Sequence, residues 1–192
     1  MKKIFSLLIF AAMILTTTAA FATAYREDVT EGADIASIKR IAIALPQHFK
    51  AEDTEPTLEE FTQSVFDASK VARCYVISYD EILANIRKDT GVDVKSLSDS
   101  EAEKTFKDTV SKYADAYLVV TTANNSKRTQ FFFEVRNSQS GELVYVLTSQ
   151  SSDWGKNAKD YKKACEDFYK KFDAAAEKNL KDQQKAEKKK NK

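Results

Sequence analysis

Apolar residues in this chain occur in two patterns, as short continuous runs and as longer stretches with apolar positions three or four residues apart. Runs rich in β-branched and aromatic residues predict strands over 40–45, 75–77 and 116–122. The run at 116–122 is apolar on both faces, which indicates a central strand. Pro46 ends the first run, and 47–56 is expected to be a polar loop.

Helical spacing separates these runs. Thr57 and Glu60 have the spacing of a capping box and begin a helix that runs to about residue 69. Ser98 and Glu101 have the same spacing at the start of a later helix, and Gly91 ends the short helix before it. A long helix is predicted from 157 to about 180, with an apolar stripe formed by Tyr161, Cys165, Phe168, Phe172 and Ala176.

Two further strands, 130–136 and 142–148, flank a turn that ends in Gly141 and predict a hairpin. Three strands separated by helices imply parallel pairing, and the hairpin adds an antiparallel edge. The expected fold is therefore mixed α/β, a five-stranded mixed sheet with three parallel strands, an antiparallel hairpin and packed helices. The residues expected to be buried are Ile41, Ile43, Phe61, Val65, Val76, Leu118, Val120, Val135, Phe168 and Phe172.

The amino terminus has the pattern of a signal peptide. Lys2 and Lys3 precede an apolar run over 4–15, and small residues follow up to Ala24. The run is shorter than the roughly 20 residues of a membrane-spanning helix. We predict cleavage after Ala24, with Ala22 as the second site, and an uncleaved anchor as the alternative. Cys74 is the first cysteine of the chain, so a lipid anchor at the cleavage site is not expected and the protein should be periplasmic or secreted.

The chain is expected to comprise a signal peptide (1–24), a polar lead-in (25–37), one α/β domain (38–180) and a disordered Lys-rich tail (181–192). Charge is distributed unevenly: residues 25–177 carry a net charge of −6 and residues 178–192 a net charge of +5. A basic face interleaved with aromatic residues, as in nucleic-acid-binding proteins, is missing from the sequence. A charge run usually keeps a protein soluble, but it can also contact an anionic surface, here through Lys185, Lys188, Lys189, Lys190 and Lys192.

Cys74 and Cys165 are the two cysteines of the chain. In an oxidising compartment they can form a disulfide bond. Their flanking residues place one at the start of a strand and the other inside a helix, and a buried free thiol is a common core residue. Both alternatives remain open from the sequence.

The sequence offers few candidates for catalytic or metal-binding residues. His48 is the single histidine, and with no companion ligand or nucleophile nearby it is expected to be a solvent-facing loop residue. The carboxylates of 52–55 and 59–60 are expected to be solvated loop and helix-cap charges, and no phosphate-binding, dinucleotide-binding or nucleophile-elbow motif occurs. Phe131 and Phe133 should point into the core, whereas Phe132 points to the opposite face and is a candidate contact for a partner.

Four motifs resemble a family of envelope proteins that includes the amino-terminal domain of TolB, CsgG and LpoB. They are a first strand that ends in Leu-Pro (IAIALP, 41–46), an aromatic-acidic pair before a short helix (ISYDEIL, 77–83), an Ala-Asp entry into a strand (YADAYLVV, 113–120) and a hairpin turn with Gly-Glu (VRNSQSGELV, 135–144). The resemblance covers about 38–180 and implies a sheet in which the second strand lies at one edge, followed by the first, third, fourth and fifth.

The family brings no catalytic residues to this chain, because the matching motifs are structural. The signal peptide, the resemblance and the missing catalytic constellation together indicate an exported, non-catalytic accessory or binding module of the envelope, with another envelope protein as the expected partner. The charge distribution argues against nucleic acid, and no cofactor is expected. The alternative is a carboxylate-dependent periplasmic hydrolase, which requires Asp or Glu side chains, His48 and a Ser to converge.

Overall fold

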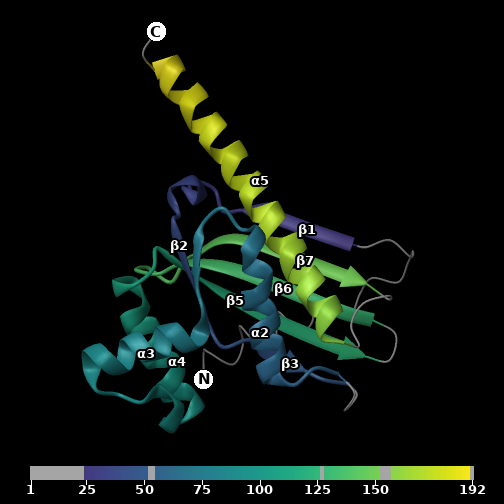
Figure 1. Cartoon of the computed structure of the whole chain (residues 1–192). Helices are drawn as coiled ribbons and strands as arrows, with labels where there is room; N and C mark the ends of the chain where they lie inside the picture. The colour runs from purple at the N-terminus through teal and green to yellow at the C-terminus, as the bar shows by residue number, and fades with distance from the viewer. Residues whose placement is uncertain (1–23, 52–54, 126–127, 152–156, 191–192) are drawn as a thin grey trace, which may run out of the picture.

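The computed structural model describes residues 24–51, 55–125, 128–151 and 157–190. Its strands form one mixed sheet in the order β1-β7-β6-β5-β2-β4, and the short strand β3 pairs with β5 (Figure 1). The pairs β2–β4, β2–β5 and β3–β5 are parallel, and the pairs β5–β6, β6–β7 and β1–β7 are antiparallel. The strands are β1 (Ala24–Val29), β2 (Arg40–Ile43), β3 (Gln47–Phe49), β4 (Tyr75–Ile77), β5 (Ala116–Asn125), β6 (Arg128–Asn137) and β7 (Leu143–Ser151).

The helices begin and end where the sequence supplies capping groups. Thr57 N–H donates to Glu60 Oε2 at 2.8 Å and Glu60 N–H donates to Thr57 Oγ1 at 3.1 Å, which completes a capping box. Gly91 ends a helix with φ 74°, a left-handed conformation that glycine adopts without strain. The α-helices are α2 (Leu58–Ala68), α3 (Tyr79–Thr90), α4 (Asp99–Thr109) and α5 (Ala158–Lys190), and the 3₁₀ helices are η1 (Ile35–Ser37), η2 (Ser69–Val71), η3 (Val94–Ser96) and η4 (Val110–Lys112).

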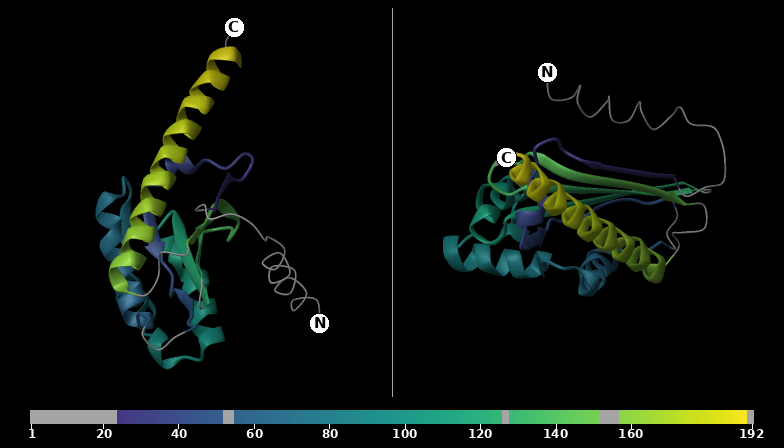
Figure 2. Two further views of the ribbon diagram at one scale, coloured as in Figure 1. Left: turned by 90° about the vertical axis from the view of Figure 1, so that its right-hand side faces the viewer. Right: turned by 90° about the horizontal axis from the view of Figure 1, so that it is seen from above.

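Two hydrophobic clusters lie on opposite faces of the sheet. The larger cluster packs α2 and α5 against one face, where Phe168 of α5 stacks on Phe133 of β6 with ring centroids 4.7 Å apart. The smaller cluster packs α3 and α4 against the other face, beside β2 and β4 and the first residues of β5. Figure 2 shows α5 lying across the strands of the hairpin and continuing beyond the sheet.

The fold class, the strand order and the core expected from the sequence are confirmed. The five expected strands correspond to β2, β4, β5, β6 and β7, and they lie in the expected order. All ten residues expected to be buried are at most 6% exposed. The sheet nevertheless has seven strands rather than five.

The two additional strands correct the expectations for 25–37 and 47–56. Part of the expected lead-in forms β1, which pairs with β7 along its whole length and satisfies the backbone groups of that edge. Its Glu27 accepts a hydrogen bond from the hydroxyl of Tyr145 at 3.2 Å. Part of the expected loop forms β3, because the chain resumes pairing with β5 after Pro46.

The expectation of a disordered tail is also wrong for 181–190, because α5 is helical as far as Lys190. The residues after Leu180 are mostly Lys, Gln, Glu and Ala, which have high helix propensity, and they extend a helix that is already nucleated by packing. Asn179 Nδ2 donates to Ala33 O at 3.1 Å and Gln183 Nε2 donates to Asp34 Oδ1 at 2.9 Å, which ties this part of α5 to the lead-in.

Candidate functional site

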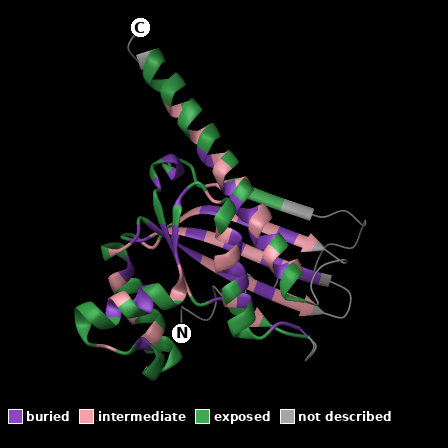
Figure 3. Cartoon of the chain, viewed as in Figure 1, coloured by how far each residue is buried: buried purple, intermediate pink, exposed green. Residues whose placement is uncertain are grey.

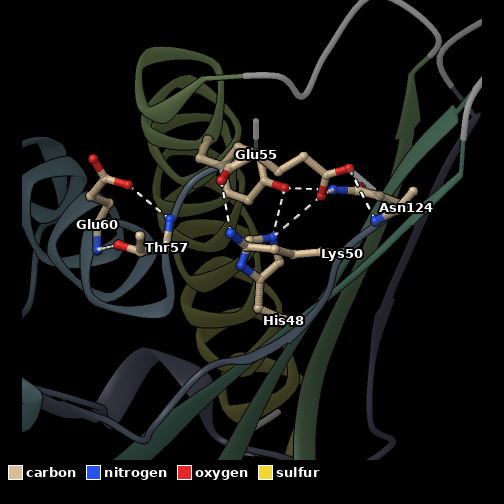
Figure 4. Close-up of polar contacts among 8 residues, drawn as sticks. His48, Lys50, Glu55, Thr57, Glu60 and Asn124 are labelled. Atoms are coloured by element: carbon tan, nitrogen blue, oxygen red, sulfur yellow. Dashed lines mark hydrogen bonds and ion pairs between the residues drawn. The ribbon is translucent and has the colours of Figure 1, made fainter. Parts of the chain in front are cut away.

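A buried polar cluster lies where β3 and β5 end beneath the first turns of α5 (Figure 4). His48 comes from β3, Glu55 from the segment before α2, Asn124 from β5 and Tyr161 from α5. His48 Nε2 lies 3.0 Å from the hydroxyl of Tyr161 and 3.7 Å from Glu55 Oε2. Asn124 Nδ2 donates both to the Tyr161 hydroxyl, at 2.6 Å, and to Glu55 Oε2. The four side chains therefore form one continuous polar network.

Burial determines the electrostatics of this cluster. The side chains of His48 and Glu55 are 3% and 5% exposed. Burial lowers the pKa of His48, an effect that the nearby Glu55 carboxylate opposes and Lys50 reinforces. The rings of Phe61 and Tyr161 lie 5.2 and 5.4 Å from the imidazole, centroid to centroid. His48 is thus held in an aromatic environment that favours its neutral form.

The structure corrects the expectations for His48 and Glu55, which are neither solvent-facing nor solvated. The cause is long-range, because β3 pairs with β5 and turns His48 toward α5. The neighbouring positions 52–54 lie outside the described residues. Glu60 is a helix-cap charge as expected. A motif search could not find this cluster, because its members are far apart in the sequence. His48 and Tyr161 are separated by 113 residues, and Glu55 and Asn124 by 69.

We expect His48 to make stability depend on pH. Because its pKa is lower in the folded state than in the unfolded state, the unfolded chain takes up a proton first as the pH falls below about 6.5. The stabilisation associated with neutral His48 is complete above that pH and is lost below it. Urea unfolding at pH 7.5 and 5.5 should therefore show a larger loss for the wild type than for His48→Gln, and equal losses in both proteins would contradict this assignment.

The cluster meets part of the requirement for a hydrolase, since a carboxylate and His48 converge. The same burial separates them from any substrate in the solvent. The surface hollows between η1 and α5 and between the β1–η1 segment and the hairpin turn have other linings, which include Asp34, Arg73, Asp115 and Glu142. Within the described ranges, no group of three or more His, Cys, Asp or Glu side chains is arranged to hold a metal ion. The arrangement is suited to locking β3, β5 and α5 together.

A second feature is the part of the sheet that faces away from α2 and α5. Along β6 and β7, buried residues alternate with half-buried ones, as expected for strands with one covered face (Figure 3). Beyond the region covered by α3 and α4, no described helix lies on the half-buried side of the hairpin (Figure 2). We call this surface the open sheet face and define it by Thr121, Ala123, Gln130, Phe132, Glu134, Val146, Thr148 and Gln150.

Phe132 lies at the centre of the open sheet face. It pairs in register with Thr121 of β5 and Thr148 of β7, and Gln130 and Glu134 lie two residues away along its own strand. Phe131 and Phe133 point to the other side and are fully buried, whereas Phe132 is half-buried. The split of the three phenylalanines between the two faces agrees with the expected strand alternation.

Cys74 and Cys165 are free thiols in this structure, both buried in the larger cluster. Burial raises the pKa of Cys74 to about 11, with Asp173 adding to the shift, and burial also raises the pKa of Cys165. Tyr169 belongs to the same cluster, and burial raises the pKa of its hydroxyl, with Cys165 and Cys74 adding to the shift.

We therefore expect both cysteines to be unreactive in the folded protein, because alkylation requires an accessible thiolate. Iodoacetamide at pH 8 should leave the native mass unchanged and add two groups in urea without any reductant. No modification in urea until a reductant is added would instead indicate a disulfide bond.

The candidate lysines occupy the end of α5. Lys185, Lys188 and Lys189 are exposed residues of the helix, and Lys185 lies 3.4 Å from Asp182. Lys190 is the last residue of α5, and Lys192 lies outside the described residues.

Comparison with known proteins provides matches at the level of structure. Neither a protein-family model nor a curated protein matches the chain. The LpoB C-terminal domain from Escherichia coli matches with a TM-score of 0.47 and 15% identity, over 64% of this chain and 90% of that chain. The lipoprotein GNA1162 from Neisseria meningitidis matches with a TM-score of 0.41 and 10% identity, over 60% and 81% of the two chains. PelC from Paraburkholderia phytofirmans, a dodecamer, matches with a TM-score of 0.40 and 6% identity, over 76% and 91%.

The matches include LpoB, one of the proteins that the sequence motifs resemble. At these identities the likeness concerns chain topology alone. Among the described residues, no helix combines the length and the apolar character needed to cross a membrane. The predicted signal peptide lies outside the described residues up to position 23.

Proposed function

We propose that this chain is an exported, non-catalytic binding module of the cell envelope whose partner is another envelope protein. The observation that carries the proposal is the open sheet face, where an aromatic side chain is surrounded by a mixture of Thr, Gln, Glu, Val and Ala. Protein interfaces commonly combine a central aromatic contact with a polar rim that excludes water. Phe132 is the candidate centre of such a contact.

Export is supported by the signal-peptide pattern of residues 1–24. Cleavage after Ala24 leaves Tyr25 as the first residue and preserves all but the first position of β1. The intact mass of the protein recovered from its host should correspond to residues 25–192 without lipid. An uncleaved or lipid-modified product would contradict this part of the proposal.

The buried cluster supports a non-catalytic role, because His48 and Glu55 are enclosed by protein. A general acid or base must come within hydrogen-bond reach of its substrate, directly or through one water molecule. Each of the four side chains instead bonds to another element of the fold, which accounts for their placement in structural terms.

Affinity capture with variant baits tests the proposed binding face. The mature chain, Phe132→Asp and the matched control Ser100→Asp, an exposed position on α4, would be exposed to envelope extract after circular dichroism confirms that all three are folded. We expect at least one protein to be retained by the wild type and the control but reduced about tenfold or more with Phe132→Asp. Identical protein sets on all three baits would contradict a role of the open sheet face.

A further inference from the structure

The exposed lysines of α5 form a single line along the helix. Successive residues of an α-helix are rotated by about 100°, so positions can be compared around its circumference. On this basis the exposed lysines of α5 from Lys163 onward fall within an arc of about 100°, and Lys159 in the first turn lies just beside it. We call this line the lysine stripe and define it by Lys163, Lys170, Lys178, Lys181, Lys185, Lys188 and Lys189.

The lysine stripe faces away from the body of the protein. Ala176 is 1% exposed, and Asn179 and Gln183 hydrogen-bond to the segment before η1, so these residues mark the inward side of α5. Their positions around the helix are roughly opposite the centre of the stripe. The stripe thus occupies the solvent side of a helix that projects beyond the sheet (Figures 1 and 2).

Charge complementarity indicates an anionic partner. The residues within or beside the stripe that carry negative charge are Asp167, Glu177 and Asp182, so the line retains a net positive charge. Residues 25–177 have a net charge of −6 even with the stripe lysines Lys163 and Lys170 included, so the body of the protein is acidic. An anionic surface would therefore be repelled by the body and attracted by α5, which fixes how the protein approaches it.

The chemistry of the stripe favours a continuous surface over a discrete ligand. It contains lysines and no arginine, and a lysine acts as a flexible point charge without the fork geometry that recognises an individual phosphate or carboxylate. From Lys163 to Lys189 the stripe is about 39 Å long at 1.5 Å per residue, and the helix holds it straight. A flat surface can meet all of these charges at once.

We propose that the lysine stripe adsorbs the protein to an anionic lipid bilayer without insertion. Insertion of a surface helix requires an apolar face, and α5 beyond Leu180 has none. Attraction between exposed lysines and anionic headgroups is additive over several residues and is screened by salt. Adsorption through the outer side of α5 places the bilayer on the side of the sheet opposite the open sheet face, which stays accessible to a partner. The proposal is independent of the proposed protein partner.

Vesicle sedimentation with charge-matched variants tests this proposal. The stripe variant carries Lys→Gln at 178, 181, 185, 188 and 189, where Gln retains helix propensity. The control carries Lys→Gln at 70, 88, 104, 107 and 112, which are also exposed and give the same net charge. Each protein would be mixed with phosphatidylcholine vesicles with and without 25% phosphatidylglycerol, at about 20 and 500 mM NaCl, where the screening length differs severalfold.

We expect the wild type and the control to bind the anionic vesicles at low salt, and the stripe variant to bind at least about tenfold more weakly. Binding should be lost at high salt and on neutral vesicles. Equal weakening of the stripe variant and the control would overturn the proposal, because total charge alone would then account for binding. Failure of the wild type to bind vesicles would also overturn it, and stripe-dependent binding of soluble polyphosphate in that case would identify a polyanion instead.

Discussion

Phe168→Ala should reduce the free energy of unfolding by about 3–5 kcal/mol, because truncation of a buried phenylalanine removes apolar contacts and leaves a cavity. Phe168 is fully buried at the centre of the aromatic layer between α5 and the sheet. Its ring lies 4.7 Å from that of Phe133, 5.0 Å from that of Tyr169 and 6.1 Å from that of Tyr145. These rings come from three elements, so little local collapse can fill the space.

Urea denaturation at pH 7.5 measures this loss. Phe49→Ala is the matched control, since Phe49 is 60% exposed and should contribute less than about 0.5 kcal/mol. If Phe168→Ala unfolds at the same urea concentration as Phe49→Ala, the packing of α5 on the hairpin is not as described.

The second large effect is expected at the polar cluster, where Glu55→Ala should cost about 2–3 kcal/mol. The carboxylate accepts from Asn124 Nδ2 and from the backbone N–H of Ala51, the latter at 3.1 Å. Its removal leaves one N–H of the part-buried Asn124 amide and the Ala51 N–H without this acceptor, and a donor left unsatisfied away from water costs more than the hydrogen bond itself contributes. Glu55→Gln should cost less, because the amide oxygen can still accept one of these bonds.

The control for this experiment is Glu31→Ala, at an exposed turn position, which should change stability by less than about 0.5 kcal/mol. Circular dichroism during thermal unfolding provides the comparison. Equal midpoints for Glu55→Ala and Glu31→Ala would show that Glu55 is solvated, as its sequence context had indicated.

The central part of the fold could be predicted from the sequence because each of its segments has a strong local pattern. The apolar runs of β2, β4 and β5, the capping boxes of α2 and α4 and the turn at Gly141 each specify one element. The preference of consecutive elements for short, right-handed connections then restricts the strand order. β1 was missed because its sequence, AYREDV, is that of a charged edge strand without an apolar run.

The polar cluster could not be predicted because the residues that form it share no local pattern. His48 lies two residues after Pro46, and Glu55 lies in a run of carboxylates, so each resembles a loop residue until pairing of β3 with β5 brings them beneath α5. The helical end of α5 was missed for a different reason. Residues 181–190 have no apolar stripe, a pattern typical of a disordered tail, but their high helix propensity and the contact of Gln183 with Asp34 extend the helix.

Photo-cross-linking in living cells can show whether the protein binds an envelope partner through the open sheet face. A photoreactive amino acid at position 132 would be compared with the same residue at position 100, which is exposed on α4. Irradiation at position 132 should produce a discrete protein adduct that is missing at position 100. Adducts that are the same at both positions, or missing at both, would contradict binding through this face.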